Sequence, residues 1–214
     1  MTSSEFDFVG LENEDNHEYS SKPRRLEWNL DSESIDAISD ATKKANELYA
    51  HCYSHLYSLP ITGLRFFTVY GPWGRPDMAY FLFTKSILEG EKINIYNYGE
   101  MYRDFTFIDD IIESLIRIMK VPPQKNKNFN KKNPTSDSSW APHRVFNIGN
   151  SDSIKLIDFI GVIEKVLGIS ANKNFLPMQK GDVESTLADT QLLEECINFK
   201  PNTTLKIGLE KFVN

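Results

Sequence analysis

Arg75 and Asp77 bring a guanidinium and a carboxylate to the end of an apolar stretch within residues 63–78, GLRFFTVYGPWGRPDM. A guanidinium pairs with a carboxylate or phosphate through two parallel hydrogen bonds, so this loop could hold an anionic ligand. Residues 61–69 are mostly β-branched or aromatic, which predicts a strand covered on both faces. Open α/β sheets bind ligands beyond the carboxyl ends of their strands, where this loop would stand. The alternative is an ordinary buried strand followed by a surface turn.

Two other groups of residues are weaker candidates for chemistry. His51 and His55 are four residues apart and could share a metal ion with Cys52, but no acidic or histidine motif completes the site. We therefore predict no metal site and a partly exposed helix surface. Residues 125–132 are basic but interrupted by Asn and Phe in an acidic chain, which favours a solvated loop over a nucleic-acid surface.

Hydrophobic periodicity predicts helices that alternate with strands. One helix begins near Ser39 and ends before Pro60, and the other predicted helices are 78–89, one capped by Asp109 or Asp110, 153–167, 189–196 and 204–213. Besides 61–69, the predicted strands are 93–98, 103–107 and 144–148, with a short extended piece at 175–178. Alternation of this kind is typical of the α/β class, although the strands are few for a complete doubly wound sheet.

Two of these helices carry apolar stripes at spacings of three and four, a pattern typical of an amphipathic helix. The first stripe consists of Ala41, Ala45, Leu48, Cys52 and Leu56. The second consists of Ile112, Leu115, Ile116 and Met119.

Composition limits the class of protein. A chain of 214 residues with 40% hydrophobic residues is long enough for one domain with a core, or one and a half. A net charge of −6 argues against a sequence-independent nucleic-acid binder. Two cysteines without CxxC spacing fit a reduced compartment, and neither a long apolar run nor a basic, apolar amino terminus is present. We therefore expect a soluble, cytoplasmic protein without a membrane partner.

The chain divides into three predicted regions. Residues 1–36 are polar and acidic, which predicts a disordered or poorly defined extension. Residues 37–214 would form the folded domain. Within it, residues 122–142 are rich in Lys, Asn, Ser and Pro, which predicts a flexible surface insertion without chemistry. Neither GxGxxG nor GxxGxxG occurs, so no glycine loop for a dinucleotide pyrophosphate is expected.

Four blocks in order carry a resemblance to a known family: ATKKANELYAHCYSHLYSLPITGLRFFTVYGPWGRPDM, RDFTFIDDI, RVFNIGN and LPMQKGDVESTLADT. From Ala41 to Val213 the chain resembles the carboxyl-terminal portion of an extended short-chain dehydrogenase/reductase, most closely the UDP-glucuronate 4-epimerases. The resemblance implies an incomplete NAD-binding Rossmann-like α/β fold. It would comprise the late strands and helices of the sheet and the small UDP-sugar-binding domain, without the glycine-rich half.

The resemblance also implies roles for residues of the catalytic centre. Lys43 matches the lysine of the YxxxK motif, which holds the nicotinamide ribose and lowers the pKa of the catalytic tyrosine. Ser39 stands where that tyrosine should be, and a serine hydroxyl is far less acidic. Lys43 is equally interpreted as a solvated helix lysine. Tyr70 is a further expected cofactor contact, and Ser3 or Ser4 faintly matches a serine-rich strand end beside the sugar.

Four further positions match contacts to the UDP-sugar. Thr68 and Arg75 match residues that face the sugar and its carboxylate. Arg103 matches an arginine near the UDP phosphates, with a salt bridge to Asp104 or Asp110 as its structural alternative. Asp182 matches a loop residue close to the uridine ribose, with loop capping as its alternative.

The family reaction, as the resemblance implies it, oxidises C4 of UDP-glucuronate with bound NAD and returns hydride to the opposite face, giving UDP-galacturonate. Because the base and the cofactor loop are missing from the sequence, we expect the isolated chain not to catalyse this reaction. Three hypotheses stay open: a truncated or split epimerase, a non-catalytic UDP-sugar-binding module, and a degenerate structural remnant. A homodimer through helix 41–56, or pairing with a missing Rossmann half, would supply the protein partner.

Overall fold

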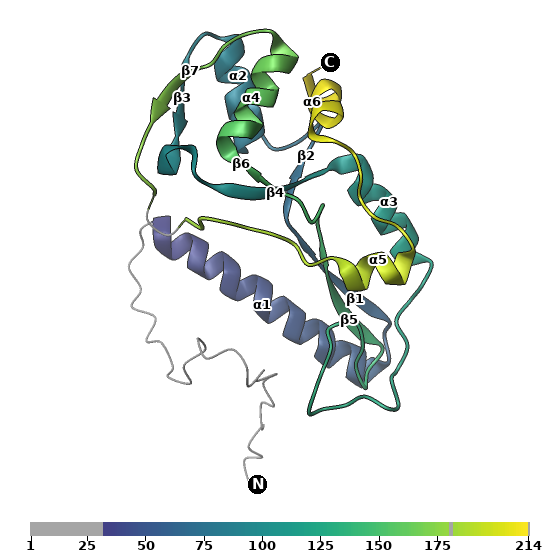
Figure 1. Cartoon of the computed structure of the whole chain (residues 1–214). Coiled ribbons are helices and arrows are strands. Elements are labelled where there is room, and N and C mark those ends of the chain that lie inside the picture. Colours follow the sequence, from purple (N-terminus) through teal and green to yellow (C-terminus); the bar gives the residue numbers. More distant parts are fainter. Residues whose placement is uncertain (1–31, 180–181, 214) are drawn as a thin grey trace.

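The computed structural model describes residues 32–179 and 182–213, with side chains described from residue 41 onward (Figure 1). Of the extension predicted over residues 1–36, the first 31 residues lie outside the described residues, and so do Ser3 and Ser4. The remaining five belong to helix α1, Ser32–Tyr57, which therefore begins seven residues earlier than predicted. The α/β class predicted from the sequence is confirmed, with parallel strand pairs flanked by helices.

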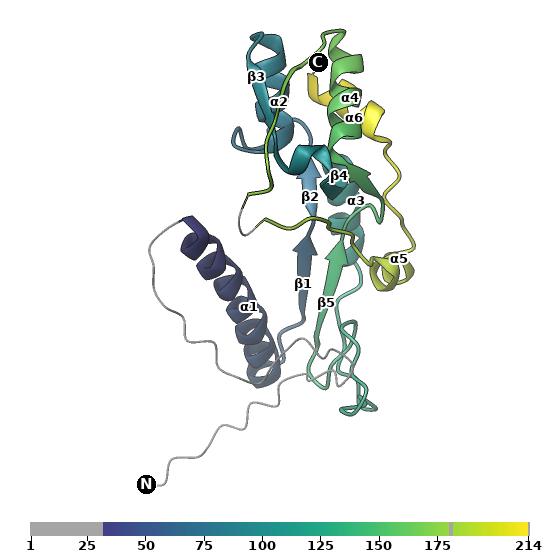
Figure 2. The same ribbon diagram turned by 60° about the vertical axis from the view of Figure 1, so that its left-hand side comes forward.

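One half of the molecule is a layer of two parallel strands between helices. Strand β1, Ile61–Phe66, pairs with β5, His143–Ile148, in a register from Ile61 opposite His143 to Phe66 opposite Ile148. Helix α1 lies on one side of this pair, and helices α3, Ile108–Met119, and α5, Gln191–Ile197, lie on the other (Figure 2). The core on that second side consists of Ile111, Ile118, Phe146, Ile148, Leu193 and Ile197.

The single strand predicted over residues 61–69 is wrong, because the chain changes partners at Phe67. Strand β1 ends at Phe66, and the Phe67 amide still donates to the Ile148 carbonyl oxygen at 3.1 Å. Strand β2, Thr68–Tyr70, then pairs with β4, Tyr102–Phe107, instead of β5. The prediction that both faces are covered also fails for β1, since the Phe66 side chain is 51% exposed.

The other half is built around strands β2, β4 and β6, Ser153–Lys155, in that order, with β6 antiparallel to β4. A separate parallel pair joins β3, Lys92–Ile95, to β7, Asn172–Phe175. Helices α2, Ala79–Leu88, α4, Leu156–Leu167, and α6, Leu205–Val213, cover these strands (Figure 1). Their shared core is rich in aromatic rings, with Phe105 and Phe159 stacked at 4.0 Å between centroids.

Several predicted boundaries are corrected by local backbone geometry. The strand predicted to reach Tyr98 ends at Ile95, because Asn97 and Tyr98 adopt left-handed conformations in the short 3-10 turn Tyr96–Gly99. Residues 153–155, predicted as the first helical turn, form β6 instead. The extended piece predicted at 175–178 lies earlier, as β7. The predicted cap by Asp109 or Asp110 is absent, since Phe107 is the residue before α3 and makes no side-chain cap bond.

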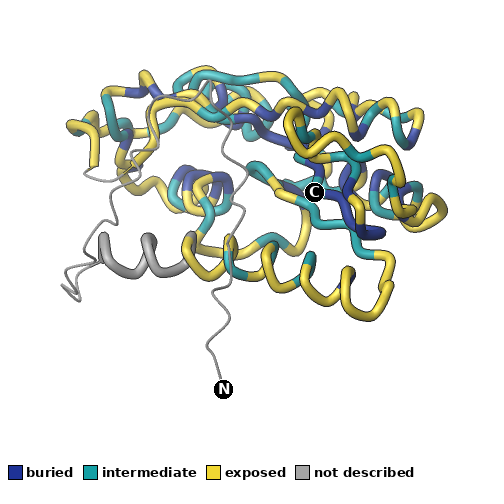
Figure 3. Tube along the Cα trace, turned by 90° about the horizontal axis from the view of Figure 1, so that it is seen from below, coloured by how far each residue is buried: buried dark blue, intermediate teal, exposed yellow. Residues whose placement is uncertain are grey.

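Most residues of the two apolar stripes are exposed in this chain, although Leu115 packs against the core. On α3 the buried residues are Asp110, Ile111, Ser114 and Ile118, whereas Ile112, Ile116 and Met119 are 46%, 40% and 72% exposed. On α1 the stripe that includes Leu48, Cys52 and Leu56 is also exposed, and Figure 3 shows this helix with little buried surface. Both faces are apolar surfaces that the described residues leave uncovered.

The 122–142 segment, predicted as a flexible insertion, is anchored at its carboxyl-terminal end. The Asn126 amide donates to the Ser139 carbonyl oxygen at 2.9 Å, and the Val145 amide donates to the Ser136 carbonyl oxygen at 2.7 Å. Its flexibility stays a prediction. Among the described residues no helix is both long and apolar enough to cross a membrane.

Candidate functional site

A cavity of about 560 Å³ lies between α2, β3, the start of β4 and the segment after β7. Thr68, Arg103 and Asp182, three of the four residues predicted to contact substrate, line it together. The rest of the lining is mixed: Asp77, Met78, Ala79, Leu82, Phe83, Ser86, Lys92, Ile93, Asn94, Tyr96, Met101, Phe105, Leu156 and Gln179. A cavity of this size with apolar walls and a few polar groups is typical of a small-ligand site.

Arg103 is held by three acceptors at the wall of this cavity. Its Nη2 donates to Asp182 Oδ1 at 2.8 Å, and its Nη1 donates to the carbonyl oxygens of Tyr102 at 2.9 Å and Glu184 at 3.2 Å. The salt bridge to Asp104 or Asp110, considered from the sequence, is therefore replaced by an ion pair with Asp182. With its side chain 18% exposed, Arg103 presents a fixed positive charge that could pair with a phosphate.

Asp104, the next residue along β4, fixes the strand that carries Arg103. Its fully buried carboxylate accepts hydrogen bonds from the backbone amides of Asn150 at 2.8 Å, Ser151 at 3.0 Å and Ala188 at 3.0 Å. These amides belong to the turn after β5 and to the segment before α5. One carboxylate therefore joins three chain segments behind the cavity, a role that the sequence reading did not assign.

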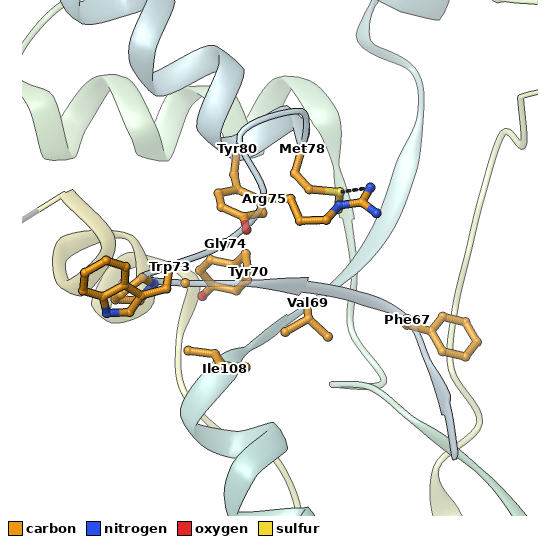
Figure 4. Close-up of a pocket in the computed structure, with 11 residues that line it drawn as sticks. Phe67, Val69, Tyr70, Trp73, Gly74, Arg75, Met78, Tyr80 and Ile108 are labelled. Carbon is orange, nitrogen blue, oxygen red and sulfur yellow. Dashed lines mark hydrogen bonds between the residues drawn. The ribbon is translucent and has the colours of Figure 1, made fainter. Parts of the chain in front are cut away.

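A second hollow, of about 420 Å³, lies beside the loop that follows β2 (Figure 4). Arg75 lines this hollow instead of the larger cavity, and its Nη2 donates to Asp77 Oδ2 at 3.0 Å. Asp77 lines the larger cavity, so the ion pair bridges the two spaces. Both side chains are mostly exposed, which leaves the Arg75 guanidinium available to an anionic ligand. Trp73 stands in this loop with a left-handed backbone and a fully exposed ring.

The Tyr70 side chain belongs to the core. Its ring makes edge contacts with Tyr80, Phe105, Phe107 and Phe159 and is 1% exposed. Burial raises the pKa of its phenol well above the usual range, with the negative charge of Asp110 adding to the effect. Within the described residues its hydroxyl has no hydrogen-bond partner. The cofactor contact predicted for Tyr70 stays a prediction, and it would fall to the backbone or ring edge that borders the second hollow.

Lys43 lies on α1 and lines neither space. Its ammonium is on an exposed part of the helix. Ser39 is in the same helix, but its side chain is outside the described part. The catalytic and cofactor roles predicted for Lys43 stay predictions.

Of the two histidines of α1, His51 packs against other side chains, whereas His55 is exposed. His51 Nε2 and Ser139 Oγ are 2.8 Å apart, and the His51 ring makes edge contacts with Trp140 and His143. Within the described ranges, no group of three or more His, Cys, Asp or Glu side chains could hold a metal ion.

Sequence reading missed most of the polar groups around the larger cavity, notably Lys92, Asn94 and Gln179. The sequence did contain a pattern that could have identified Lys92 and Asn94. Ile93 and Ile95 alternate with Lys92 and Asn94 along one strand, so burying the isoleucines turns the polar pair to the other face. Gln179 carried no such signal, because it follows a strand that was itself misplaced by prediction.

Comparison with known proteins fits this geometry. The chain is 56% identical over 194 residues to an uncharacterized 37.6 kDa protein of Escherichia coli O111:H-, over 89% of this chain and 58% of that protein. It is 49% identical over 174 residues to a probable UDP-glucuronate 4-epimerase of Rhizobium meliloti, and this match covers 81% of this chain and 51% of that protein. The structure also matches a solved UDP-glucuronic acid 4-epimerase from Bacillus cereus, which is in complex with UDP-glucuronic acid and NAD. The TM-score is 0.67 and the sequence identity is 34%, and the match covers 80% of this chain and 50% of that one.

The fold is therefore a partial Rossmann-like one, similar to that of the solved epimerase. Residues 39–133 match the model of the NAD dependent epimerase/dehydratase family. The chain spans about half the length of the curated relatives it matches, from 39% to 58%.

The described residues do not fit the pyrophosphate of a dinucleotide. Dinucleotide-binding folds hold this group on a glycine-rich turn at a helix amino terminus. Within residues 32–179 and 182–213 neither GxGxxG nor GxxGxxG occurs. We therefore derive no step through NAD from this part of the chain.

Proposed function

We propose that the larger cavity binds a UDP-uronate such as UDP-glucuronate, as the related epimerases do. The observation that carries the proposal is the Arg103–Asp182 ion pair at 2.8 Å in the wall of one cavity. The family resemblance assigns these two residues, 79 positions apart in sequence, to the phosphates and the ribose. An arginine already oriented by three acceptors loses little side-chain entropy when it binds a phosphate.

The sugar would lie toward Thr68, which lines the same cavity. Arg75 and Asp77 stand at the boundary with the second hollow, so a uronate carboxylate that reaches this boundary would meet the Arg75 guanidinium. A neutral hexose offers no charge to that arginine. The arrangement therefore supports selection for an acidic sugar.

We further propose that the chain alone binds this ligand without epimerising it. C4 oxidation requires a base that takes the hydroxyl proton, and the matching position holds Ser39, whose hydroxyl is a poor base near neutral pH. The described residues also lack a dinucleotide cradle. The function supported best is thus a UDP-sugar-binding epimerase portion, with catalysis dependent on groups that these residues do not supply.

Calorimetric titration with UDP tests the binding proposal. We expect Arg103→Ala to weaken UDP binding by at least tenfold while uridine binding changes little, because the arginine contacts the phosphates. Lys120→Ala is the matched control, since this exposed cation lines neither space. Absence of UDP binding by the wild-type chain, or equal losses in the variant and the control, would refute the proposal.

An activity assay tests the second part. Purified chain is incubated with UDP-glucuronate and excess NAD, and the nucleotide sugars are separated by chromatography. We expect no UDP-galacturonate. Its accumulation above a no-protein control would show that Ser39 does not prevent catalysis.

We also propose that helix α1 pairs with a second copy of the chain through its exposed apolar stripe. Leu48 and Leu56 are 47% and 69% exposed on one helix, and such a surface is costly to leave in water. Light scattering of the wild type and of a Leu48→Glu, Leu56→Glu variant tests this. The mass should fall from that of a dimer to that of a monomer, and a monomeric wild type would contradict the proposal.

A further inference from the structure

Arg75 and Asp77 are brought together by a tight turn of residues 75–78. The Met78 amide donates to the Arg75 carbonyl oxygen at 3.2 Å, which closes the turn. Pro76 occupies its second position, where the fixed backbone angle of proline favours such a turn. The side chains on either side of Pro76 then meet, with Arg75 Nη2 at 3.0 Å from Asp77 Oδ2. The ion pair is therefore built into the backbone of the loop.

This ion pair occupies a donor group of Arg75 that an anionic ligand would also use. The same Nη2 group contacts Met78 Sδ at 3.7 Å (Figure 4). In the part of the chain that the structure describes, Asp77 is the only carboxylate that pairs with Arg75. The Arg75 and Asp77 side chains are 74% and 67% exposed, so water screens the pair and a competing anion can displace it. Asp77 is thus a weak internal ligand of Arg75.

Asp77 also borders the space in which the sugar would lie. This step rests on the proposed function, in which the sugar lies toward Thr68 and its carboxylate meets Arg75. Thr68 and Asp77 line the larger cavity, whereas Arg75 lines the second hollow. A uronate carboxylate that pairs with Arg75 must take the place of Asp77 and leave that carboxylate without its partner. A neutral hexose leaves the ion pair intact.

We propose that Asp77 competes with the uronate carboxylate for Arg75 and thereby limits the preference of the cavity for UDP-uronates over neutral UDP-hexoses. Two effects disfavour the uronate alone, because the ion pair must break and two carboxylates then come close together. A hexose brings no charge that Asp77 would repel, and its hydroxyl groups can donate to the Asp77 carboxylate. The effect of Asp77 on affinity depends on the charge of the sugar, which makes it a specificity-determining residue.

Calorimetric titration of the full chain with UDP-glucuronate, UDP-glucose and UDP tests this inference, because the three probes share the nucleotide and differ in the sugar. Asp77→Asn keeps the shape of the side chain and removes its charge. We expect it to tighten UDP-glucuronate binding about two- to fivefold, the range of an exposed ion pair, and to change UDP-glucose and UDP binding less than about twofold. Asp77→Ser, which also removes the charge, should give the same change.

Glu89→Gln is the matched control for Asp77→Asn. It removes the same charge from an exposed residue that lines neither space, so it should leave the ratio of UDP-glucuronate to UDP-glucose affinity unchanged. Because Arg75 and Asp77 are mostly exposed, their variants should keep the thermal unfolding midpoint of the wild type, and this is checked first.

A double-mutant comparison separates competition for Arg75 from simple repulsion. In an Arg75→Met background, Asp77→Asn should lose most of its effect on UDP-glucuronate binding, because there is no guanidinium to release. A gain of the same size in that background would overturn the inference and assign Asp77 to direct repulsion. An Asp77→Asn protein that binds UDP but keeps the wild-type ratio of affinities would overturn this inference alone. A wild-type chain that does not bind UDP would remove the proposed function and the inference together.

Discussion

Arg65 holds both carboxylate oxygens of Glu47, with Nε at 2.6 Å from Oε1 and Nη2 at 2.8 Å from Oε2. The pair joins strand β1 to helix α1, whose apolar stripe is otherwise exposed. Hydrogen bonding from Arg65 lowers the pKa of Glu47 to about 2, against the opposing effect of burial. The orientation of α1 against the strands therefore depends on a polar contact as well as on packing.

Removing this ion pair should loosen the helix. We expect Arg65→Met to lower the free energy of unfolding by about 1 kcal/mol, a modest value because the arginine side chain is half exposed and the pair is screened by solvent. Urea denaturation measures the change. Lys206→Met, which removes an exposed pair within helix α6, is the control and should cost less than about 0.5 kcal/mol. Equal effects of the two substitutions would contradict the structural role.

Acid should destabilise the protein through His143. Burial, with the neighbouring charge of His51, lowers the pKa of His143 to about 4 from 6.5, and the nearby Glu47 opposes the shift. His51 has its own pKa lowered by burial and by His55. A histidine that stays neutral when folded contributes stability above pH 6.5 that is lost as the pH falls toward 4.

We expect the free energy of unfolding to drop by about 1–2 kcal/mol between pH 7.5 and pH 5, as each unit of pKa difference is worth about 1.4 kcal/mol. His143→Phe should reduce this drop. Glu47 adds little over this range, because both its folded pKa of about 2 and its ordinary value of 4.5 lie below pH 5. A variant with the full pH dependence of the wild type would show that other groups cause it.

Replacing a carboxylate oxygen of the buried Asp104 should destabilise the strand that carries Arg103. Asp104→Asn places an amide nitrogen near backbone amides that need an acceptor, so we expect a loss of about 2–4 kcal/mol in stability. UDP binding should weaken too, because Arg103 is the adjacent residue of β4. Asp152→Asn removes an exposed carboxylate close in sequence to the same turn and serves as the control. Urea denaturation and calorimetry of both variants give the comparison, and a stable Asp104→Asn protein would refute the role.

Two helical glycines should respond in opposite directions to alanine. A Cβ atom at Gly208 would stand 2.2 Å from Tyr70 Oη and 2.8 Å from Phe107 Cδ2, so Gly208→Ala should cost about 1–3 kcal/mol through overpacking. At Gly161 a Cβ atom would meet nothing within 4 Å, and Gly161→Ala should stabilise α4 by about 0.5–1 kcal/mol. Thermal unfolding of the two variants measures both changes in stability. A stabilising change at Gly208 would mean that α6 lies farther from Tyr70.

Local patterns in the sequence predicted the α/β class and most elements, because periodicity and glycine stops act over a few residues. Gly168 ends α4 in a left-handed conformation, as expected for a glycine after a helix. The division at Phe67 was not predictable, since the apolar pattern continues while the pairing partner changes. The exposed stripe on α3 shows the same limit. Ile112 and Ile116 are apolar, but the sequence pattern does not identify a packing partner for them, and both are exposed.

Prediction of the site was similarly divided. The resemblance selected Thr68, Arg103 and Asp182, which the structure brings to one cavity. The resemblance did not predict the role of Asp104. Its hydrogen-bond partners are backbone amides, which a pattern of side chains in the sequence does not reveal. Arg75 lies beside a separate hollow, in the loop where Trp73 adopts a left-handed conformation.

The change of pairing at Phe67 places the predicted site residues on two different strand pairs. Thr68 pairs opposite Phe105 and so shares a rigid sheet with Arg103, whereas Lys43 belongs to the helix that rests on β1. Val69 of β2 packs into the same core cluster as Leu64 of β1 and Ile148 of β5, so shared packing joins the two strand pairs across the break in pairing. A substitution in this shared core would therefore disturb the position of helix α1 relative to the cavity that Arg103 lines.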